Sequence, residues 1–469
     1  MSERLRATAF VLAAALALTT AVCGTATAAP APPTGPDGVW RTDGYGTLVS
    51  VEDGGRRLRT YDVTAVSCLP GLTEATGKGD GSGRFTDPGG DVLTITPDGP
   101  GRARMTDAEN VGHRTLRRVG ALPADCTARP GPDERSDPRR VFDVFWRTYA
   151  ENYPFFEAHG IDWKAVRDRF RPRITAETTD DELFAVLRQM IEPLHDGHTS
   201  VKAPKDRRFA GHRADTVIPT KESIARMDRA VAEAVGVPLR TWAQGAISYA
   251  ELPDGTGYLR ITRFHGYAAK GGPEADVAEL DRALDAVLAH APRGLVVDLR
   301  FNAGGSDRLG VHIAERLTDR PYTAYLKHAR NDPGNPRKFT PAVPVRVTPS
   351  PSPRYTGPLA VLTGRLTISA GETFTQALMG RSPAPVRIGE NTQGCFSDVL
   401  ERVLPRTGWT FALPNEEFMR PGDRRTYDVT GIPPTIRTPV FTEEEFAEHR
   451  DSALKRARQV LAHSSPSGA

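Results

Sequence analysis

The sequence lacks several features that would indicate particular classes of protein. Beyond the N-terminus, no stretch approaches the roughly 20 apolar residues that span a bilayer. The formal net charge is only +3, so no excess charge indicates a nucleic-acid or membrane-surface partner. No internal repeat is visible. Because 39% of the 469 residues are apolar, the chain can bury a sizeable core, and its length predicts about three domains.

The one apolar run lies at the N-terminus and is too short for a stable membrane span. Two arginines precede it and small residues follow it, which is the pattern of a secretory signal peptide. We expect residues 1–28 to be removed by cleavage after Ala28, so that the chain is exported. Lipoprotein anchoring at Cys23 is less favoured, because Val22 is too large for that processing signal.

Cysteine is scarce, with four in the whole chain and three after this cleavage. Cys68 and Cys126 flank one N-terminal segment and can form a disulfide in an oxidising compartment. Cys395 is then left unpaired. Its simplest interpretation is a small buried residue.

Residues 38–126 have the pattern of a β-rich domain. Short runs such as "RLRTYDVT" and "VLTITP" are separated by Gly, Asp and Pro turns. This predicts a small antiparallel barrel or a sandwich, with no residue cluster that suggests chemistry. Residues 127–139 are polar and Pro-rich and predict a linker.

Residues 140–203 predict a helical segment. Its aromatic residues recur at three- and four-residue steps, which favours a helix face packed in a core over a ligand site. Thr179 and Glu182 have the spacing of a capping box for a second helix. The aromatic residues are Phe142, Phe145, Trp146, Tyr149, Tyr153 and Phe156.

Strands and helices alternate over residues 251–440. The runs "GLVVDLR" and "LAVLTG" are almost continuously apolar, as expected for strands buried on both faces of a sheet. The chain as a whole therefore predicts a multidomain α/β protein. Residues 204–250 connect the two regions, and residues 441–463 predict a C-terminal helix.

Two segments carry residues with chemical potential. In "DLRFNAGGS", Gly304 and Gly305 follow a buried strand and can offer main-chain N–H groups to an anion, or form only a tight turn. In "HDGHT", the three-residue spacing of His195 and His198 allows a metal site, but no third ligand lies nearby. A loop histidine also suits a general base, and it can equally hydrogen-bond within its own turn.

The third segment is "LTISAGETF", where Ser369 stands between an apolar strand and a helix. The Ser-x-x-Glu spacing to Glu372 is that of a capping box, in which serine only starts the helix. A serine at such a join is also where hydrolases place a nucleophile. The N–H of Ala370 would then be free to stabilise an oxyanion.

Taken together, "DGHT", "DLRFNAGG", "TISAGE", "RIGENTQG" and "TYDVTGIPP" occur in an order that resembles the tail-specific, or C-terminal processing, serine proteases. The resemblance covers roughly residues 140–440 and is strongest to the tricorn-core-like branch. It implies a core related to the Clp protease and crotonase fold, with no metal or organic cofactor. It also implies Ser369 as nucleophile, His198 as base and Asp428 as acidic partner, with oxyanion donors at Gly304, Gly305 and Ala370.

The sequence departs from the family pattern at three positions. Cys395 stands where one branch has its catalytic lysine, so we do not expect a Ser–Lys mechanism. Gly197 replaces the serine that precedes the histidine in the tricorn-like branch. Asp428 replaces the usual Glu and is one methylene shorter.

The resemblance predicts a secreted serine-type peptidase whose partner is a peptide or protein substrate. An alternative is a non-catalytic binder of a hydrophobic ligand or peptide on the same fold. A third hypothesis gives the main role to the N-terminal β domain, as a carbohydrate- or surface-binding module. Residues 204–250 are too few for the PDZ domain that tail-specific members often carry.

Overall fold

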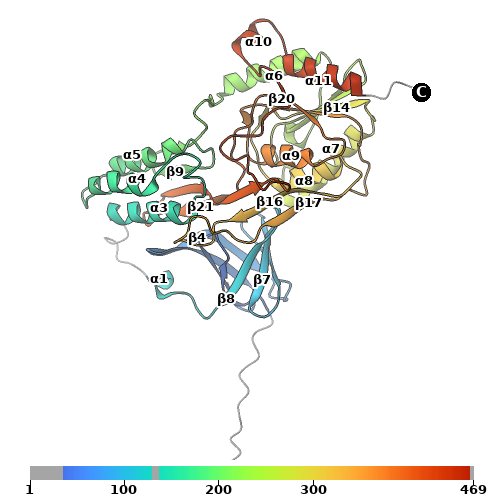
Figure 1. The fold of residues 1–469 in the computed structure, drawn as a ribbon. Helices are drawn as coiled ribbons and strands as arrows, with labels where there is room; N and C mark the ends of the chain where they lie inside the picture. The colour runs from blue at the N-terminus through green and yellow to red at the C-terminus, as the bar shows by residue number, and fades with distance from the viewer. Residues whose placement is uncertain (1–34, 129–136, 465–469) are drawn as a thin grey trace, which may run out of the picture. The chain divides into compact units, whose positions relative to one another are not determined.

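The computed structural model describes residues 35–128 and 137–464 (Figure 1). The predicted signal peptide, Cys23 and most of the predicted linker lie outside these residues. The described chain forms an N-terminal eight-stranded barrel, a helical segment and an α/β core. The expected multidomain α/β architecture is confirmed.

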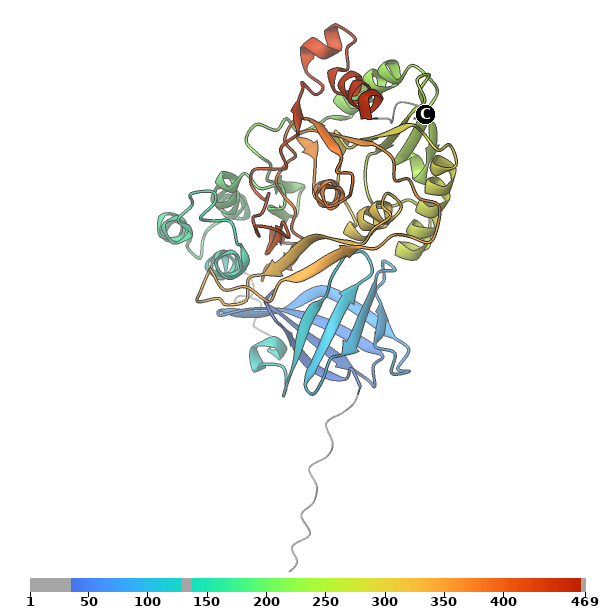
Figure 2. The same ribbon diagram turned by 45° about the vertical axis from the view of Figure 1, so that its right-hand side comes forward.

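The N-terminal domain is a closed barrel, which decides between the two predicted forms (Figure 2). Each strand pairs antiparallel with the next, and β1 closes the barrel by pairing with both β2 and β8. Side chains alternate between exposed and buried along β7, as a barrel wall requires. The strands are β1 (Gly38–Thr42), β2 (Thr47–Glu52), β3 (Arg57–Thr64), β4 (Ser67–Gly77), β5 (Arg84–Thr86), β6 (Val92–Pro97), β7 (Arg102–Asp107) and β8 (Arg114–Val119).

A disulfide joins Cys68 on β4 to Cys126 on the short helix α1 (Ala124–Thr127). It ties the chain that leaves the barrel back to the barrel wall. Cys395 is free and buried.

The helical segment comprises α3 (Pro138–Asn152), α4 (Trp163–Phe170) and α5 (Asp180–Ile191). The predicted capping box is present, because Thr179 and Glu182 exchange hydrogen bonds at the start of α5. The aromatic stripe of α3 is core, as predicted, and most of its rings are fully buried. Two of its hydroxyls reach other parts of the chain, since Tyr149 donates to Ala412 O and Tyr153 to Asp196 Oδ2, both at 2.9 Å.

The segment after α5 differs from the prediction. The end of the predicted helical segment forms β9 (Ser200–Ala203), and the start of the predicted connecting segment forms β10 (Arg207–Ala210). Strand β9 pairs with β22 (Thr410–Pro414), which pairs in turn with β21 (Val399–Val403). The partner strand lies about two hundred residues later in the chain, so no local pattern could predict it. Helix α6 (Lys221–Val235) follows.

The α/β core is built on a seven-stranded sheet in the order β11-β12-β13-β14-β18-β20-β24. The strands from β13 to β24 are parallel, and β14 and β18 are buried at every position, as predicted from their apolar runs. The strands are β11 (Arg240–Trp242), β12 (Ile247–Glu251), β13 (Thr256–Ile261), β14 (Gly294–Asp298), β18 (Leu359–Thr363), β20 (Val386–Gly389) and β24 (Ile436–Arg437).

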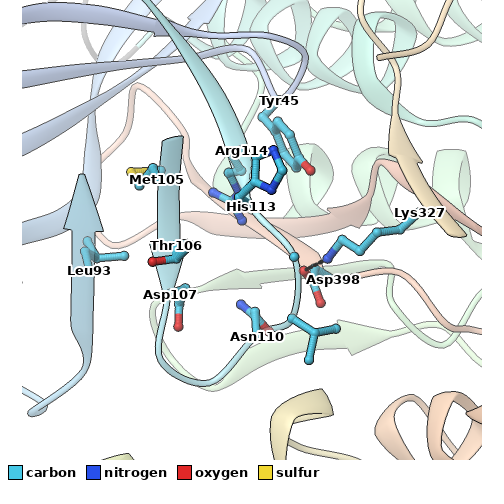
Figure 3. Close-up of a pocket in the computed structure, with 12 residues that line it drawn as sticks. Tyr45, Leu93, Met105, Thr106, Asp107, Asn110, His113, Arg114, Lys327 and Asp398 are labelled. Atoms are coloured by element: carbon cyan, nitrogen blue, oxygen red, sulfur yellow. Dashed lines mark hydrogen bonds and ion pairs between the residues drawn. The ribbon is translucent and has the colours of Figure 1, made fainter. Parts of the chain in front are cut away.

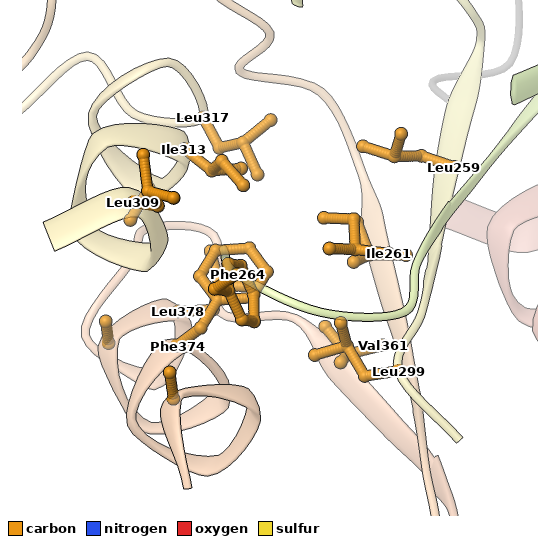
Figure 4. Close-up of a cluster of buried hydrophobic side chains, with 14 of the residues drawn as sticks. Leu259, Ile261, Phe264, Leu299, Leu309, Ile313, Leu317, Val361, Phe374 and Leu378 are labelled. Carbon is orange, nitrogen blue, oxygen red and sulfur yellow. The ribbon is translucent and has the colours of Figure 1, made fainter. Parts of the chain in front are cut away.

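Helices cover both faces of this sheet. On one face, α7 (Gly272–Leu288), α8 (Asp307–Glu315) and α9 (Ala370–Met379) bury a large apolar cluster (Figure 4). On the other, α6 and the C-terminal α11 (Ser452–Ser464) pack on the alternate side chains of the same strands. Helix α10 (Glu443–Ala447) precedes α11. In the described residues, no helix is both long and apolar enough to cross a membrane.

A three-stranded sheet, β17-β16-β23, lies beside the barrel in both views (Figures 1 and 2). It consists of β16 (Tyr322–Ala329), β17 (Val343–Val347) and β23 (Glu416–Met419). The barrel contacts the rest of the chain through buried polar groups. Tyr45 donates to Glu416, and Arg402 pairs with Asp62 at 2.9 Å.

Candidate active site

Ser369 lies in a tight turn between the short strand β19 (Leu366–Thr367) and helix α9. Its backbone has φ 54° and ψ −118°, a conformation that costs a non-glycine residue about 1–3 kcal/mol. Such strain persists only where the surroundings hold it. The parallel pairing of β19 with β15 (Phe301–Asn302) fixes one side of the turn.

Glu372 holds the other side. Its carboxylate is fully buried and accepts hydrogen bonds from three main-chain N–H groups: Ser369 at 3.2 Å, Gly394 at 2.6 Å and Cys395 at 2.9 Å. Burial raises its pKa to about 6, although these hydrogen bonds and one from Thr392 lower it. The predicted capping box is therefore present at the start of α9, with the Glu372 carboxylate bonding back to the Ser369 N–H.

Two main-chain N–H groups beside Ser369 are free to bind an oxyanion. In the described residues, neither Gly305 nor Ala370 uses its N–H in a hydrogen bond. Gly304 differs from the prediction, because its N–H already donates to Asn302 Oδ1 at 2.9 Å. Its role is steric, since a Cβ on Gly304 would lie 2.7 Å from Ser369 Cβ and 3.3 Å from its Oγ.

His198 lies in the turn that follows α5. Asp196 Oδ1 accepts the His198 main-chain N–H at 2.8 Å and so fixes the turn. Burial lowers the pKa of His198 to about 4, while Asp398 and a main-chain hydrogen bond with Ser397 raise it. Its Nδ1 is buried and has no hydrogen-bond partner in the described chain. His195 is exposed at the end of the preceding helical turn, in the left-handed region.

Asp428 is buried at the far side of the same region. Its carboxylate accepts the Phe396 N–H at 3.1 Å and the Thr426 hydroxyl. Burial raises its pKa well above the ordinary value, although these hydrogen bonds lower it, and the charges of Asp196 and Glu372 raise it further.

Residues 394–398 contact every part of this site. The N–H groups of Gly394 and Cys395 bond to Glu372, and that of Phe396 bonds to Asp428. The main chain of Ser397 bonds to His198. A Cβ on Gly197 would lie 3.0 Å from Cys395 Sγ, so the thiol occupies the space beside the glycine.

A buried lysine does lie near the site, although the sequence indicated none. Lys327 Nζ contacts Asp398 at 2.8 Å and Glu416 at 3.3 Å (Figure 3). The two carboxylates raise its pKa strongly against the effect of burial, so it stays protonated. A protonated amine cannot act as a general base, and the geometry gives no support to a Ser–Lys pair.

Glu372, His198 and Asp428 all lie against residues 394–397. Within the part of the chain that the structure describes, Ser369, His198 and Asp428 are not connected by hydrogen bonds as a catalytic triad would be. Among the described residues, no hydrogen bond links His198 to Ser369 or to Asp428. Sequence reasoning missed Asn302, Asp196 and Asp398, which hold or charge the site. Asn302 and Asp196 lie two residues before Gly304 and His198, but only the structure shows that they bond to these turns. The pairing of Asp398 with Lys327 joins residues far apart in sequence.

Comparison with known families gives two matches. Residues 255–438 match the model for peptidase family S41, and residues 135–192 match the model for the tricorn protease C1 domain. The first covers the α/β core with Ser369 and Asp428. The second covers the helical segment that ends just before His198. No curated protein matches the chain in sequence.

The chain is also similar to solved structures, of which the first below shares its fold. A predicted peptidase from Parabacteroides merdae is 24% identical, with a TM-score of 0.59 over 70% of this chain and 97% of that one. Mature CPAF in complex with lactacystin is 13% identical, with a TM-score of 0.49 over 70% and 98%. The photosystem II D1 C-terminal processing protease is 16% identical, with a TM-score of 0.40 over 68% and 99%.

Replacing Glu372 with Gln tests the role of the buried carboxylate. An amide has one acceptor oxygen, so at least one buried N–H loses its partner, at a cost of about 1–3 kcal/mol. We expect thermal or urea unfolding at pH 8 to show a loss of this size. The loss should be larger at pH 5 than at pH 8, because burial raises the pKa of Glu372 to about 6 and folding therefore favours its protonated form.

Glu182→Gln is the matched control, because Glu182 occupies the same position in an exposed capping box. We expect it to change the free energy of unfolding by less than about 0.5 kcal/mol. Equal losses of stability in the two variants would contradict the claim that the buried Glu372 carboxylate stabilises the protein more than an exposed capping-box glutamate does.

Proposed function

We propose that the chain, whose residues 255–438 match the model for peptidase family S41, is a secreted serine-type peptidase with Ser369 as nucleophile. Ser369 Oγ attacks the carbonyl carbon of a peptide bond, and His198 takes the hydroxyl proton. Asp428 orients the imidazole and stabilises its charge. The imidazolium then gives the proton to the leaving amine, and water hydrolyses the acyl-enzyme.

The observation that carries the proposal is the turn at Ser369. A strained serine at a helix start, with two free N–H groups beside it, suits attack on a carbonyl better than helix capping. Each donor in such an oxyanion site supplies about 3 kcal/mol of transition-state stabilisation. Gly304 has no side chain to cover Oγ, so a substrate can approach it.

The roles proposed for His198 and Asp428 rest on their positions, because neither residue is hydrogen-bonded to Ser369 or to the other in the described chain. His198 and Asp428 both contact residues 396–397, and Ser369 is tied to residue 395 through Glu372. Catalytic hydrogen bonds are often long or misaligned without substrate and tighten on binding. We propose that substrate binding brings the His198 ring to Ser369.

Export is supported by the N-terminal pattern and by the Cys68–Cys126 disulfide. Disulfides form and persist chiefly outside the reducing cytosol. The barrel that carries this disulfide would then fold after translocation.

Ser369→Ala should abolish peptide hydrolysis, with a fall of at least about 10³-fold in kcat/KM, and should leave the Tm within a few degrees. A fluorophosphonate should label the wild-type protein once, at Ser369, as read by mass spectrometry. Ser82→Ala, at an exposed barrel loop, is the control and should label fully. A wild-type protein that binds peptides but takes no label would support the non-catalytic alternative.

The pH dependence should report His198. Because burial lowers its pKa to about 4, the imidazole stays neutral and able to accept a proton down to that pH. We expect kcat/KM of the free enzyme to fall only as the pH drops through about 4. A profile measured between pH 3 and 8 that loses activity around pH 6.5 would contradict this environment for the base.

A further inference from the structure

A large cavity beside His198 lies between the barrel and the sheet that contains β9, β22 and β21. It has a volume of about 690 Å³. One wall carries Gly197 and His198, together with residues of β9, β21 and β22. The other wall comes from the barrel, through β2, β3, β4, β6 and β7. The proposed general base therefore faces the N-terminal domain across open space.

The barrel also contacts the chain just after the proposed oxyanion donor Gly305. The loop between β7 and β8 packs on the residues that follow Gly305. Glu109 O accepts the hydroxyl of Ser306 at 2.5 Å and the N–H of Arg308 at 3.3 Å, and Ala108 O accepts from Arg308 Nη1 at 3.1 Å. This loop is thus held between the cavity and the N-terminus of α8.

The barrel wall of the cavity is acidic. Asp91, Asp107 and Glu109 line it, and in the described chain none of the three carboxylates makes an ion pair. Burial and the neighbouring carboxylates raise the pKa of Glu109 to about 7 and also raise the pKa of Asp91. These carboxylates repel one another, so a cation bound among them would relieve the repulsion and stabilise their charged forms.

Two of the three basic side chains that line the cavity, Arg114 and Arg402, interact with other acidic groups, whereas Lys202 is exposed and makes no ion pair in the described residues. Arg114 stands beside Tyr45 in Figure 3, 4.5 Å from the centroid of its ring, and its charge acts on Tyr45 and Glu416 more than on Asp107. Arg402 pairs with Asp62. In all, five acidic and three basic side chains line the cavity, so its lining is net negative.

A second observation points to a missing cationic partner. Asp62 is only 6% exposed and lines the same cavity. One carboxylate oxygen, Oδ1, binds Arg402, whereas Oδ2 is buried without a hydrogen-bond partner in the described residues. A buried carboxylate oxygen without a donor is costly, and a ligand that supplies N–H groups would satisfy it.

We propose that this cavity is the substrate cleft and that the barrel selects peptides with a lysine or arginine side chain near the bond to be cut. This inference rests on the proposed function. The long side chain would lie along the barrel wall, with its charge among Asp91, Asp107 and Glu109. The peptide backbone would pass His198 and the oxyanion donors. The N-terminal barrel would therefore contribute specificity to the reaction of the α/β core.

Binding can be measured without turnover. In the Ser369→Ala protein, two fluorescent hexapeptides that differ only in a central Lys or Gln should bind differently, with the Lys peptide about tenfold tighter by fluorescence polarisation, which corresponds to one charge-assisted contact. Adding Asp107→Asn and Glu109→Gln should bring the ratio of the two affinities close to one. Asp80→Asn, an exposed barrel carboxylate away from the cavity, should leave the ratio unchanged.

Equal binding of the two peptides, or a tenfold ratio that survives Asp107→Asn with Glu109→Gln, would overturn the proposal. Hydrolysis by the wild-type protein separates it from the proposed function. If both peptides are cut at equal rates, the function stands and the cleft assignment fails. If neither is cut while the Lys peptide still binds tenfold tighter, the cleft assignment holds and the peptidase proposal fails.

Discussion

The buried carboxylate of Glu372 is the interaction on which the site depends. It accepts main-chain N–H groups from Ser369 and from residues 394 and 395. One side chain therefore holds the strained serine turn and the segment that contacts His198 and Asp428. A carboxylate with these acceptor oxygens can satisfy three buried donors, which neither an amide nor a hydroxyl can do. Glu372, at the start of α9, thus ties the proposed nucleophile to the rest of the candidate site.

The parallel sheet determines where the Ser369 turn and Glu372 lie. Strands β14 and β18 are neighbours, so the chain leaves both at the same edge of the sheet. The turn with Gly304 and the turn with Ser369 therefore meet, and β15 pairs with β19 to fix their register. Behind them α8 and α9 pack closely, because Gly310 has no side chain to collide with Phe374. The apolar cluster in Figure 4 keeps both helix starts in place.

Much of the fold could be predicted from local patterns. Continuous apolar runs identified β14 and β18, and Thr179 with Glu182 located the start of α5. The long-range features could not be predicted. Strand β9 pairs with β22, and Gly197 lies against Cys395, so both contacts join residues far apart in sequence. The hydrogen bond from the Gly304 N–H to Asn302 depends on one side-chain rotamer. The sequence also predicted no role for the barrel. Its acidic side chains suggest one only once the structure shows that they face His198 across the cavity.

The central claim is that Ser369 reacts while the N–H groups of Gly305 and Ala370 receive the oxyanion. A crystal structure of the fluorophosphonate-treated protein tests it most directly, since the phosphonyl oxygen mimics the oxyanion of the tetrahedral intermediate. The account predicts phosphorus bonded to Ser369 Oγ, its oxygen 2.7–3.1 Å from both N–H groups, and the His198 ring within hydrogen-bond reach of Oγ. A modified residue elsewhere, or an oxygen directed away from both donors, would contradict it.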